Sequence, residues 1–338
     1  MPADFLPHAD NGGPTSLAKT GAGTWILTGT NTYSGATNVA VGTLQAGSST
    51  AFSPNSAFNV AAVLDLHGFN NTIGSLSGNG TVTNNGTAPA VLTSGNDNTS
   101  TTFSGTIQDG TSVLGLTKIG TGTLELTADD TYSGGTIIEN GTLVAAVPTA
   151  GQATSFALGT GNVSLLGGTL RTPSLDPLII NVGGKYTQGP GGTLALGVAG
   201  TAGSAYDRLQ VAGGASLDGT LAVSSLNGFH PVAGNAFGVL TSGGARTGQF
   251  ATVDDFLNNN PNLQRVDVYS PNGATLVYVA AVTPAPVAAP TPTPTPPTPV
   301  PTPAPSPTPN PRSAVVVITP VPVPPIAPGA PRIHYLTF

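Results

Sequence analysis

The sequence predicts an all-β solenoid, a fold in which short strands wind into coils that stack on one another. Residues 17–47 and 116–146 form an internal repeat that aligns without a gap and is identical at about half of its positions. Short segments with alternating apolar residues follow one another from Leu17 onward, separated by Gly and Asn. Only 7% of the 338 residues are charged, and Thr, Ser, Asn and Gly supply the polarity instead. These residue types suit tight turns and extended backbone.

The two copies share the pattern L-x-K-x-G-x-G-T-x-x-L-T-x-x-x-T-Y-S-G-x-T-x(4)-G-T-L. A unit this short and glycine-rich buries its apolar residues only by stacking on similar neighbours. We therefore expect structural roles for the shared residues, which are Gly21, Gly23, Leu27, Tyr33, Gly35, Gly42 and Leu44 in the first copy and Gly120, Gly122, Leu126, Tyr132, Gly134, Gly141 and Leu143 in the second.

Comparison of the copies assigns the faces of the strands. Trp25 corresponds to Leu124, whereas Ile26 corresponds to Glu125. Side chains alternate along a strand, so position 25 and its equivalent should point inward and position 26 outward. The same reasoning places these further residues inside: Leu27, Val39, Leu44, Leu126, Ile138 and Leu143. We expect equivalent leucines to form continuous columns along the axis.

A sandwich, a propeller and an antiparallel barrel are the other folds open to such a strand-rich sequence, and the in-register repeat favours the solenoid. Coils of about 20 to 25 residues, stacked at ~4.8 Å, would give some twelve coils. The expected organisation is a disordered segment over 1–15, the solenoid over 16–181 and a β-rich cap over 182–282. A Pro-rich, extended and disordered spacer over 283–331 and a short tail over 332–338 would follow.

Within the cap region we expect two local elements. Asp254 to Asn260 should form a short helical turn, with the carboxylates near its start. Val266 to Val279 should form a hairpin around Pro271-Asn272-Gly273.

Composition argues against several partners. The net charge is −6 and the nine basic residues are scattered, which argues against nucleic acid. There is no cysteine, and no apolar run is long enough for a membrane-spanning helix. Residues 1–16 have neither the basic nor the apolar region of a signal peptide, so none is expected in this chain.

Paired carboxylates are the first candidates for catalysis. Asp129-Asp130 corresponds to Thr30-Asn31 of the first copy, which favours an Asx-rich turn. Asp254-Asp255 fits the start of the helical turn. Asp65 and His67 are two residues apart on an expected strand, so they would share a face, and we interpret them as a solvated polar pair. No catalytic residue is predicted.

No metal or cofactor is predicted either. His8, His230 and His334 have no metal-binding spacing, and Asp109 and Asp218 are expected in turns. Tyr33 and Tyr132 are expected to pack at a corner and not to stack on sugars. Asn-Gly-Thr at Asn79, Asn85 and Asn140 and Asn-Asn-Thr at Asn70 match the glycosylation sequon but also suit β-turns, which is the favoured interpretation.

The shared pattern resembles the passenger-associated β-strand repeat of bacterial autotransporters, the type V secretion family. The resemblance covers about residues 16–282, including YTQGPGGTLALGV and YDRLQVAGGASLDGTLAVSSLNGF, which resemble the C-terminal passenger region. It implies a right-handed parallel β-helix, a C-terminal part that caps the helix and assists folding, and a location at the bacterial surface or outside the cell. It also implies a C-terminal translocator barrel, which is not expected within this chain.

Family membership further implies a non-enzymatic, adhesin-like passenger whose ligand is an unknown host or cell-surface molecule. An outer-membrane barrel absent from this chain is a second implied partner. Two alternatives stay open: a carbohydrate-active parallel β-helix enzyme, and a truncated remnant of a larger autotransporter.

Overall fold

The computed structural model describes residues 3–5, 9–146, 153–173 and 176–282. The expected Pro-rich spacer and C-terminal tail lie outside the described residues, as does most of segment 1–8. The described part forms one compact unit of strands and contains no α-helix. It therefore has no helix of the length and hydropathy needed to span a bilayer.

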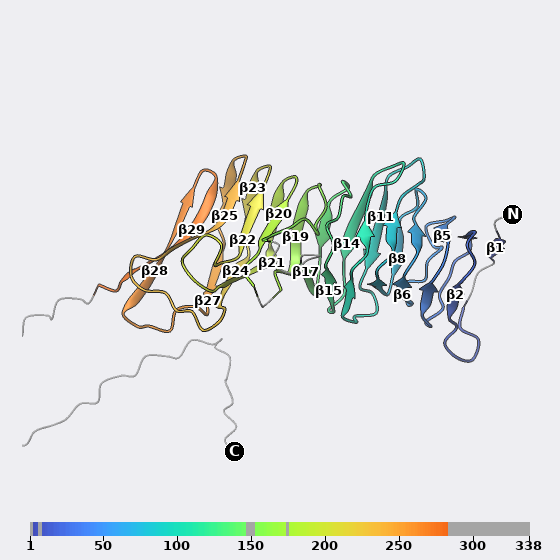
Figure 1. Cartoon of the computed structure of the whole chain (residues 1–338), viewed down its shortest axis with the longest axis horizontal. Helices are drawn as coiled ribbons and strands as arrows, with labels where there is room; N and C mark the ends of the chain where they lie inside the picture. Colours follow the sequence, from blue (N-terminus) through green and yellow to red (C-terminus); the bar gives the residue numbers. More distant parts are fainter. Residues whose placement is uncertain (1–2, 6–8, 147–152, 174–175, 283–338) are drawn as a thin grey trace, which may run out of the picture. The chain divides into compact units, whose positions relative to one another are not determined.

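The chain folds as a right-handed parallel β-helix, which confirms the predicted fold class (Figure 1). Each coil contributes strands to three faces. Face 1 begins with a six-stranded sheet made of β1 (Ala3–Phe5), β3 (Thr24–Leu27), β5 (Thr43–Ala46), β7 (Val63–Asp65), β10 (Thr81–Thr83) and β13 (Thr106–Ile107). It continues with a second six-stranded sheet made of β18 (Thr154–Ser155), β20 (Ile179–Val182), β22 (Arg208–Val211), β25 (Ala236–Ser242), β29 (Gly273–Ala280) and β28 (Leu263–Ser270).

Residues 130–131 connect the two sheets of face 1. The Thr131 N–H donates to the Ile107 carbonyl at 3.0 Å, and the Asp130 N–H donates to the Phe156 carbonyl at 3.2 Å. Main-chain hydrogen bonding between coils therefore continues along face 1 even where no strand is assigned.

Faces 2 and 3 belong to a single 17-stranded sheet, because two long strands bend and serve both faces. Face 2 consists of β2 (Leu17–Lys19), β4 (Thr37–Val39), β6 (Ala57–Val60), β9 (Ser75–Gly78), β12 (Thr101–Phe103), β15 (Thr123–Leu126), β17 (Thr142–Ala145), β24 (Thr220–Ser225) and β27 (Thr252–Asp255), with the second halves of β19 (Val163–Arg171) and β21 (Tyr186–Val198). Face 3 consists of β8 (Asn71–Ile73), β11 (Ala90–Ser94), β14 (Leu114–Lys118), β16 (Thr136–Ile138), β23 (Ala215–Leu217) and β26 (Arg246–Gly248), with the first halves of β19 and β21.

The interior is a continuous apolar core. On face 2, one inward column runs through Leu124, Leu143, Leu170, Leu194 and Leu221, all fully buried. Such burial is the main favourable contribution to folding, at roughly 25 cal/mol per Å² of apolar surface. Trp25, on the first full coil, is only partly buried and packs against this core from its edge.

The two repeats are rotated by one face relative to each other. Leu27 and Leu126 are both buried, but Leu27 lies on β3 of face 1 and Leu126 lies on β15 of face 2. Lys19 likewise lies on face 2 and Lys118 on face 3. The expectation that equivalent leucines form one continuous column is therefore wrong. The interval between the copies therefore does not equal a whole number of turns.

A shorter repeat of one coil underlies the long one. Nearly every coil starts a strand with a Gly-Thr pair, and the Thr side chains stack in one outward column on each of two faces. On face 1 the stacked residues are Thr24, Thr43, Val63, Thr81 and Thr106. On face 2 they are Thr123, Thr142, Thr169, Thr193, Thr220 and Thr252.

Parallel coils continue well beyond residue 182, up to β27. The predicted hairpin is confirmed: β28 and β29 pair antiparallel, and Pro271 and Asn272 connect Ser270 to Gly273. β29 also pairs antiparallel with β25. The predicted helical turn over 254–260 is wrong, because β27 runs through Asp255 in register with β24 and no helix follows.

Deleting residues 263–280 should lower the thermal midpoint and cause association. The hairpin covers the buried Phe237 and Leu240 and pairs the last edge of β25, so its loss exposes apolar surface and an open edge. Differential scanning calorimetry and size-exclusion chromatography test this. The double variant V266T/V268T, on the exposed side of β28, is the control and should behave like the wild type. A monomeric deletion variant with an unchanged midpoint would contradict the proposed cap.

Candidate functional site

The shared motif builds a corner closed by a buried lysine. Lys19 and Lys118 have almost no exposed surface. The Lys19 ammonium donates to the carbonyl oxygens of Gly21 and Val41, the latter at 2.8 Å and one coil further on. The Lys118 ammonium donates to the Gly120 carbonyl oxygen at 3.2 Å. Each lysine thus supplies hydrogen-bond donors to carbonyls that converge at a turn.

Burial lowers the pKa of both lysines. The Asp97 carboxylate acts in the opposite direction on Lys118. In the first copy the ammonium also lies 5.5 Å from the centroid of the Trp25 ring, within cation–π range. The carbonyl dipoles and this ring partly replace the solvation that the ammonium loses.

The next coil brings a glycine directly over this corner. Gly42 and Gly141 have φ of 75° and 67°, which is the left-handed region. A Cβ on Gly42 would lie 2.5 Å from the Gly21 carbonyl oxygen, and one on Gly141 would lie 2.4 Å from that of Gly120. The G-T-L step of the motif is therefore the place where one coil crosses closest to the corner beneath it.

The first two motif glycines have different surroundings in the two copies. A Cβ on Gly120 or Gly122 would lie 1.8 or 2.1 Å from a carbonyl oxygen of the preceding coil. A Cβ on Gly21 or Gly23 would have no described atom within 4 Å. These two motif positions thus have no room for a side chain in the second copy, whereas they have room for one in the first.

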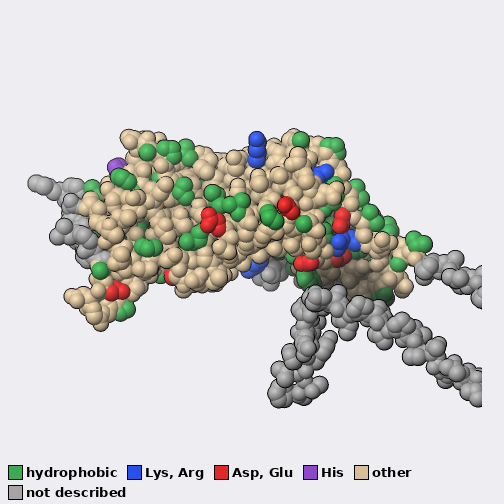
Figure 2. Space-filling model, turned by 180° about the vertical axis from the view of Figure 1, so that it is seen from behind, with side chains coloured by type: hydrophobic (Ala, Val, Ile, Leu, Met, Phe, Trp, Pro, Cys, Tyr) green, Lys and Arg blue, Asp and Glu red, His purple; other side chains and the backbone are tan. Residues whose placement is uncertain are grey.

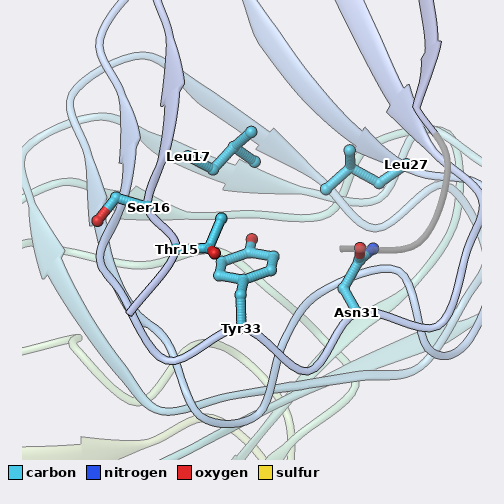
Figure 3. Close-up of a pocket in the computed structure, with 6 residues that line it drawn as sticks. All are labelled: Thr15, Ser16, Leu17, Leu27, Asn31 and Tyr33. Atoms are coloured by element: carbon cyan, nitrogen blue, oxygen red, sulfur yellow. The ribbon is translucent and has the colours of Figure 1, made fainter. Parts of the chain in front are cut away.

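The T-Y-S-G part of the motif closes a second corner. Tyr33 and Tyr132 are buried, and their hydroxyls lie 2.8 and 2.6 Å from the hydroxyls of Thr37 and Thr136. Burial raises the pKa of both tyrosines. Figure 3 shows Tyr33 in a small pocket at the first coil, where Leu17, Leu27 and Asn31 also point inward. Sequence reasoning placed these tyrosines at a corner, and they occupy equivalent corners in the two copies.

An aspartate that the motif comparison missed holds this corner from outside. Asp10 accepts hydrogen bonds from the Ser34 N–H and hydroxyl at 3.1 and 2.6 Å. Asp109 makes the same two bonds, at the same distances, with Ser133. The bond from the Ser34 hydroxyl lowers the pKa of Asp10. The signal was present in the sequence, because Asp10 and Asp109 are as far apart as Lys19 and Lys118.

A third corner of the same design was also missed. The Gln188 amide donates to the carbonyl oxygens of Gly192 and Thr220 at 3.0 and 2.9 Å. A Cβ on Gly219, which has φ of 60°, would lie 2.4 Å from the Gly192 oxygen. Gln188 thus stands where the other corners have Lys. The segment YTQGPGGTLAL aligns with LTKIGTGTLEL of the second copy without a gap, which was the available signal.

The Asp65–His67 pair does not share a strand. β7 ends at Asp65, and His67 has φ of 48°, the left-handed region. Asp65 is not solvated: it is buried and accepts the N–H groups of His67 and Asn85, both at 2.9 Å, and the Gln45 amide at 2.8 Å. The residue facing it from the preceding coil is thus an amide and not a serine. The prediction of a solvated polar pair was therefore wrong for Asp65, whereas His67 is exposed and its Nδ1 lies 3.7 Å from Asp65 Oδ2.

The other paired carboxylates bind main-chain groups. Asp129 and Asp130 lie between β15 and β16, and they accept the N–H groups of Phe156 and Ile107 at 3.3 and 2.6 Å. Asp255 accepts two N–H groups of the turn after β27 and the Tyr278 hydroxyl at 2.9 Å. It also lies 3.4 Å from the Arg265 guanidinium, which is paired with Asp267.

Among the described residues, no cluster of three or more His, Asp or Glu side chains is placed to hold a metal ion. His230 lies near the Leu257 carbonyl oxygen, at 3.1 Å from Nδ1. His8 and His334 lie outside the described side chains. The asparagines considered above as glycosylation sites are exposed between strands: Asn70, Asn79, Asn85 and Asn140.

The two copies offer a matched pair of glycine substitutions. Gly122→Ala should lower the free energy of unfolding by at least about 2 kcal/mol, because its Cβ would overlap the Thr99 carbonyl of the preceding coil. Gly23→Ala should change it by less than about 0.5 kcal/mol. Urea denaturation measures both. Equal losses in the two variants would show that the close approach of the coils is not what requires glycine.

The third corner suggests a substitution for the lysine. Lys118→Gln should nearly preserve stability, because Gln188 makes the equivalent bonds in the natural chain. Lys118→Met should cost about 1–3 kcal/mol, because it leaves buried carbonyl groups without donors. Thermal unfolding of the two variants separates the contribution of hydrogen bonding to stability from the contribution of side-chain volume. If Met is tolerated as well as Gln, the hydrogen bonds are not required.

The chain is similar to known passenger sequences over the parts described above. Residues 17–46 and 116–145 match the passenger-associated-transport-repeat family. The chain is also 39% identical, over 178 residues, to the adhesin BmaC autotransporter of Brucella suis biovar 1 (strain 1330). That alignment covers 51% of this chain and 5% of the adhesin, so the chain spans only a small part of its curated relative. The chain thus contains two passenger-associated-transport repeats that stack as part of a parallel β-helix, and about half of it is similar to a segment of an autotransporter adhesin.

Proposed function

We propose that the chain is a surface-exposed or secreted passenger module that binds partners through its outer faces and carries out no catalysis. The observation that carries the proposal is the stacking of passenger repeats into a β-helix related to a protein named as an adhesin. An unidentified host or cell-surface molecule is the proposed ligand. The bacterial surface or the extracellular medium is the proposed location.

The composition of the outer surface supports a binding role that does not depend on strong charge. The outward columns are rich in Thr, and most of these side chains are half-buried. Figure 2 shows few charged side chains on the visible face, most of which consists of hydrophobic side chains, uncharged polar side chains and backbone. Such a surface offers many hydroxyl groups at the regular spacing of the coils, about 4.8 Å. It suits a partner recognised by hydrogen bonds over an extended area.

The shared motif residues would then serve presentation. In this proposal the lysine corners, the tyrosine corners and the crossing glycines keep the coils in register, so that the outer columns stay aligned. The proposed cap is restricted to β25 and the hairpin β28–β29, because parallel coils reach β27. The solenoid would accordingly extend beyond residue 181.

Adhesion of coated beads tests this function. Inert beads carrying the purified full chain should bind cultured animal cells or matrix-coated surfaces better than bare beads. Beads carrying Gly23→Ala should bind like the wild type, and beads carrying Gly122→Ala should bind less as their folded fraction falls. Circular dichroism of the immobilised stock monitors folding. Wild-type beads that are folded but bind no better than bare beads would contradict the adhesin-like role.

A further inference from the structure

A buried carboxyl group of the second repeat has one oxygen without a partner. Asp130 has 3% of its surface exposed. Its Oδ1 accepts the Ile107 N–H at 2.6 Å, while its Oδ2 is buried and has no hydrogen-bond partner among the described residues. A buried carboxylate normally receives several donors, because an unpaired charge in the interior is strongly unfavourable.

Another buried aspartate of the chain shows how such a charge is satisfied. Asp207 has 1% of its surface exposed and accepts three hydrogen bonds. The donors are the Thr172 hydroxyl and the N–H groups of Leu178 and Gly197, at 2.5, 2.6 and 2.6 Å. Burial raises the pKa of Asp207 only to about 6, because these bonds lower it. Asp130 accepts only one hydrogen bond, from a main-chain N–H, where Asp207 accepts three.

The first repeat reveals what the position requires. The residue equivalent to Asp130 is Asn31, which is equally buried. Its amide nitrogen donates to the Ala51 carbonyl oxygen of the next coil at 2.6 Å. The Asn31 N–H donates to Thr50, as the Asp130 N–H donates to Phe156. By this register, Ala157 corresponds to Ala51 of the first copy, so the register assigns its carbonyl as the acceptor for the unpaired oxygen.

We propose that Asp130 is held as a neutral carboxylic acid whose O–H donates to the Ala157 carbonyl of the next coil, so that a proton joins these two coils. Asp130 in this form makes the same pattern of bonds as an asparagine. Loss of the proton converts the donor into an acceptor facing a carbonyl oxygen. The contact between the two coils then becomes repulsive.

The surroundings of the carboxyl group favour its neutral form. Burial raises the pKa of Asp130 to about 8, the Ile107 bond acts against this, and the neighbouring Asp129 carboxylate raises it further. Tyr132 is the other titratable group that interacts with it. The elements packed against it, β13 and β18, contain no titratable side chain. The Asp109 carboxylate accepts hydrogen bonds from the Ser133 hydroxyl and the Leu114 N–H.

The direction of the pH dependence follows from the raised pKa. The folded state binds the proton more tightly than the unfolded state, whose ordinary value is 3.8. The stabilisation is therefore complete below that value and is lost as the pH rises through about 8. Asparagine at this position keeps the donor at every pH.

Thermal unfolding of the full chain at about pH 5 and about pH 9 tests the proposal. The wild type should lose several degrees relative to Asp130→Asn on going to the higher pH. Asp129→Asn, next to it and exposed, is the control and should retain most of the wild-type pH dependence. Asn31→Asp should introduce the same loss at the first repeat.

A direct titration keeps the test independent of variant folding. The side-chain carboxyl carbon of Asp130, followed by NMR in the wild type and assigned by its absence in Asp130→Asn, should titrate far above 3.8. A carbon that titrates at or below that value would overturn the proposal. So would an Asp130→Asn variant that shows the same pH dependence of unfolding as the wild type.

Discussion

Every described coil of this solenoid is hydrogen-bonded through its main chain to the coils next to it. These bonds fix a short distance between coils, which leaves little room for side chains at the corners. Where one coil crosses the carbonyls of another, a Cβ would lie about 2 Å from an oxygen, so the neighbouring coil requires glycine there. At Gly42 and Gly141 the left-handed backbone requires glycine as well. The converging carbonyls in turn need donors, which Lys19, Lys118 and Gln188 provide. The motif thus consists of the residues needed where one coil crosses another: glycines that allow the close approach and a side chain that donates to the carbonyl groups.

The same constraint explains why polar residues are found inside. Buried Asn and Asp side chains at the turns accept N–H groups from neighbouring coils, as Asn71 does from Phe52 at 2.9 Å and Asn84 from Gly68 at 2.7 Å. Each such residue satisfies main-chain groups that the turn would otherwise leave unpaired. Asparagine can both accept and donate. An aspartate side chain donates a hydrogen bond only when its carboxyl group is protonated, and this requirement distinguishes Asp130 from the asparagines at similar positions.

Alternation in the sequence was sufficient to predict which side chains of the repeats lie inside, because burial of Leu44 or Leu143 follows from a two-residue period. It did not predict the rotation between copies, since an alignment counts residues and not turns about an axis. The helical turn after Asp254 failed because a local capping pattern competed with the register imposed by β24. Gln188 and Asp10 were overlooked because the comparison began at Leu17 and required lysine at the corner.

The one-face rotation between the copies has a geometric consequence for recognition. Tyr33 and Tyr132 mark equivalent corners, yet the strands before them lie on different faces, β3 on face 1 and β15 on face 2. A planar receptor surface lying along one side of the stack would touch the loops of one copy while the other points elsewhere. If the proposed adhesin-like role holds, two receptors approaching from different directions would engage one chain at the same time, and the duplicated sequence would crosslink them rather than double the strength of one contact.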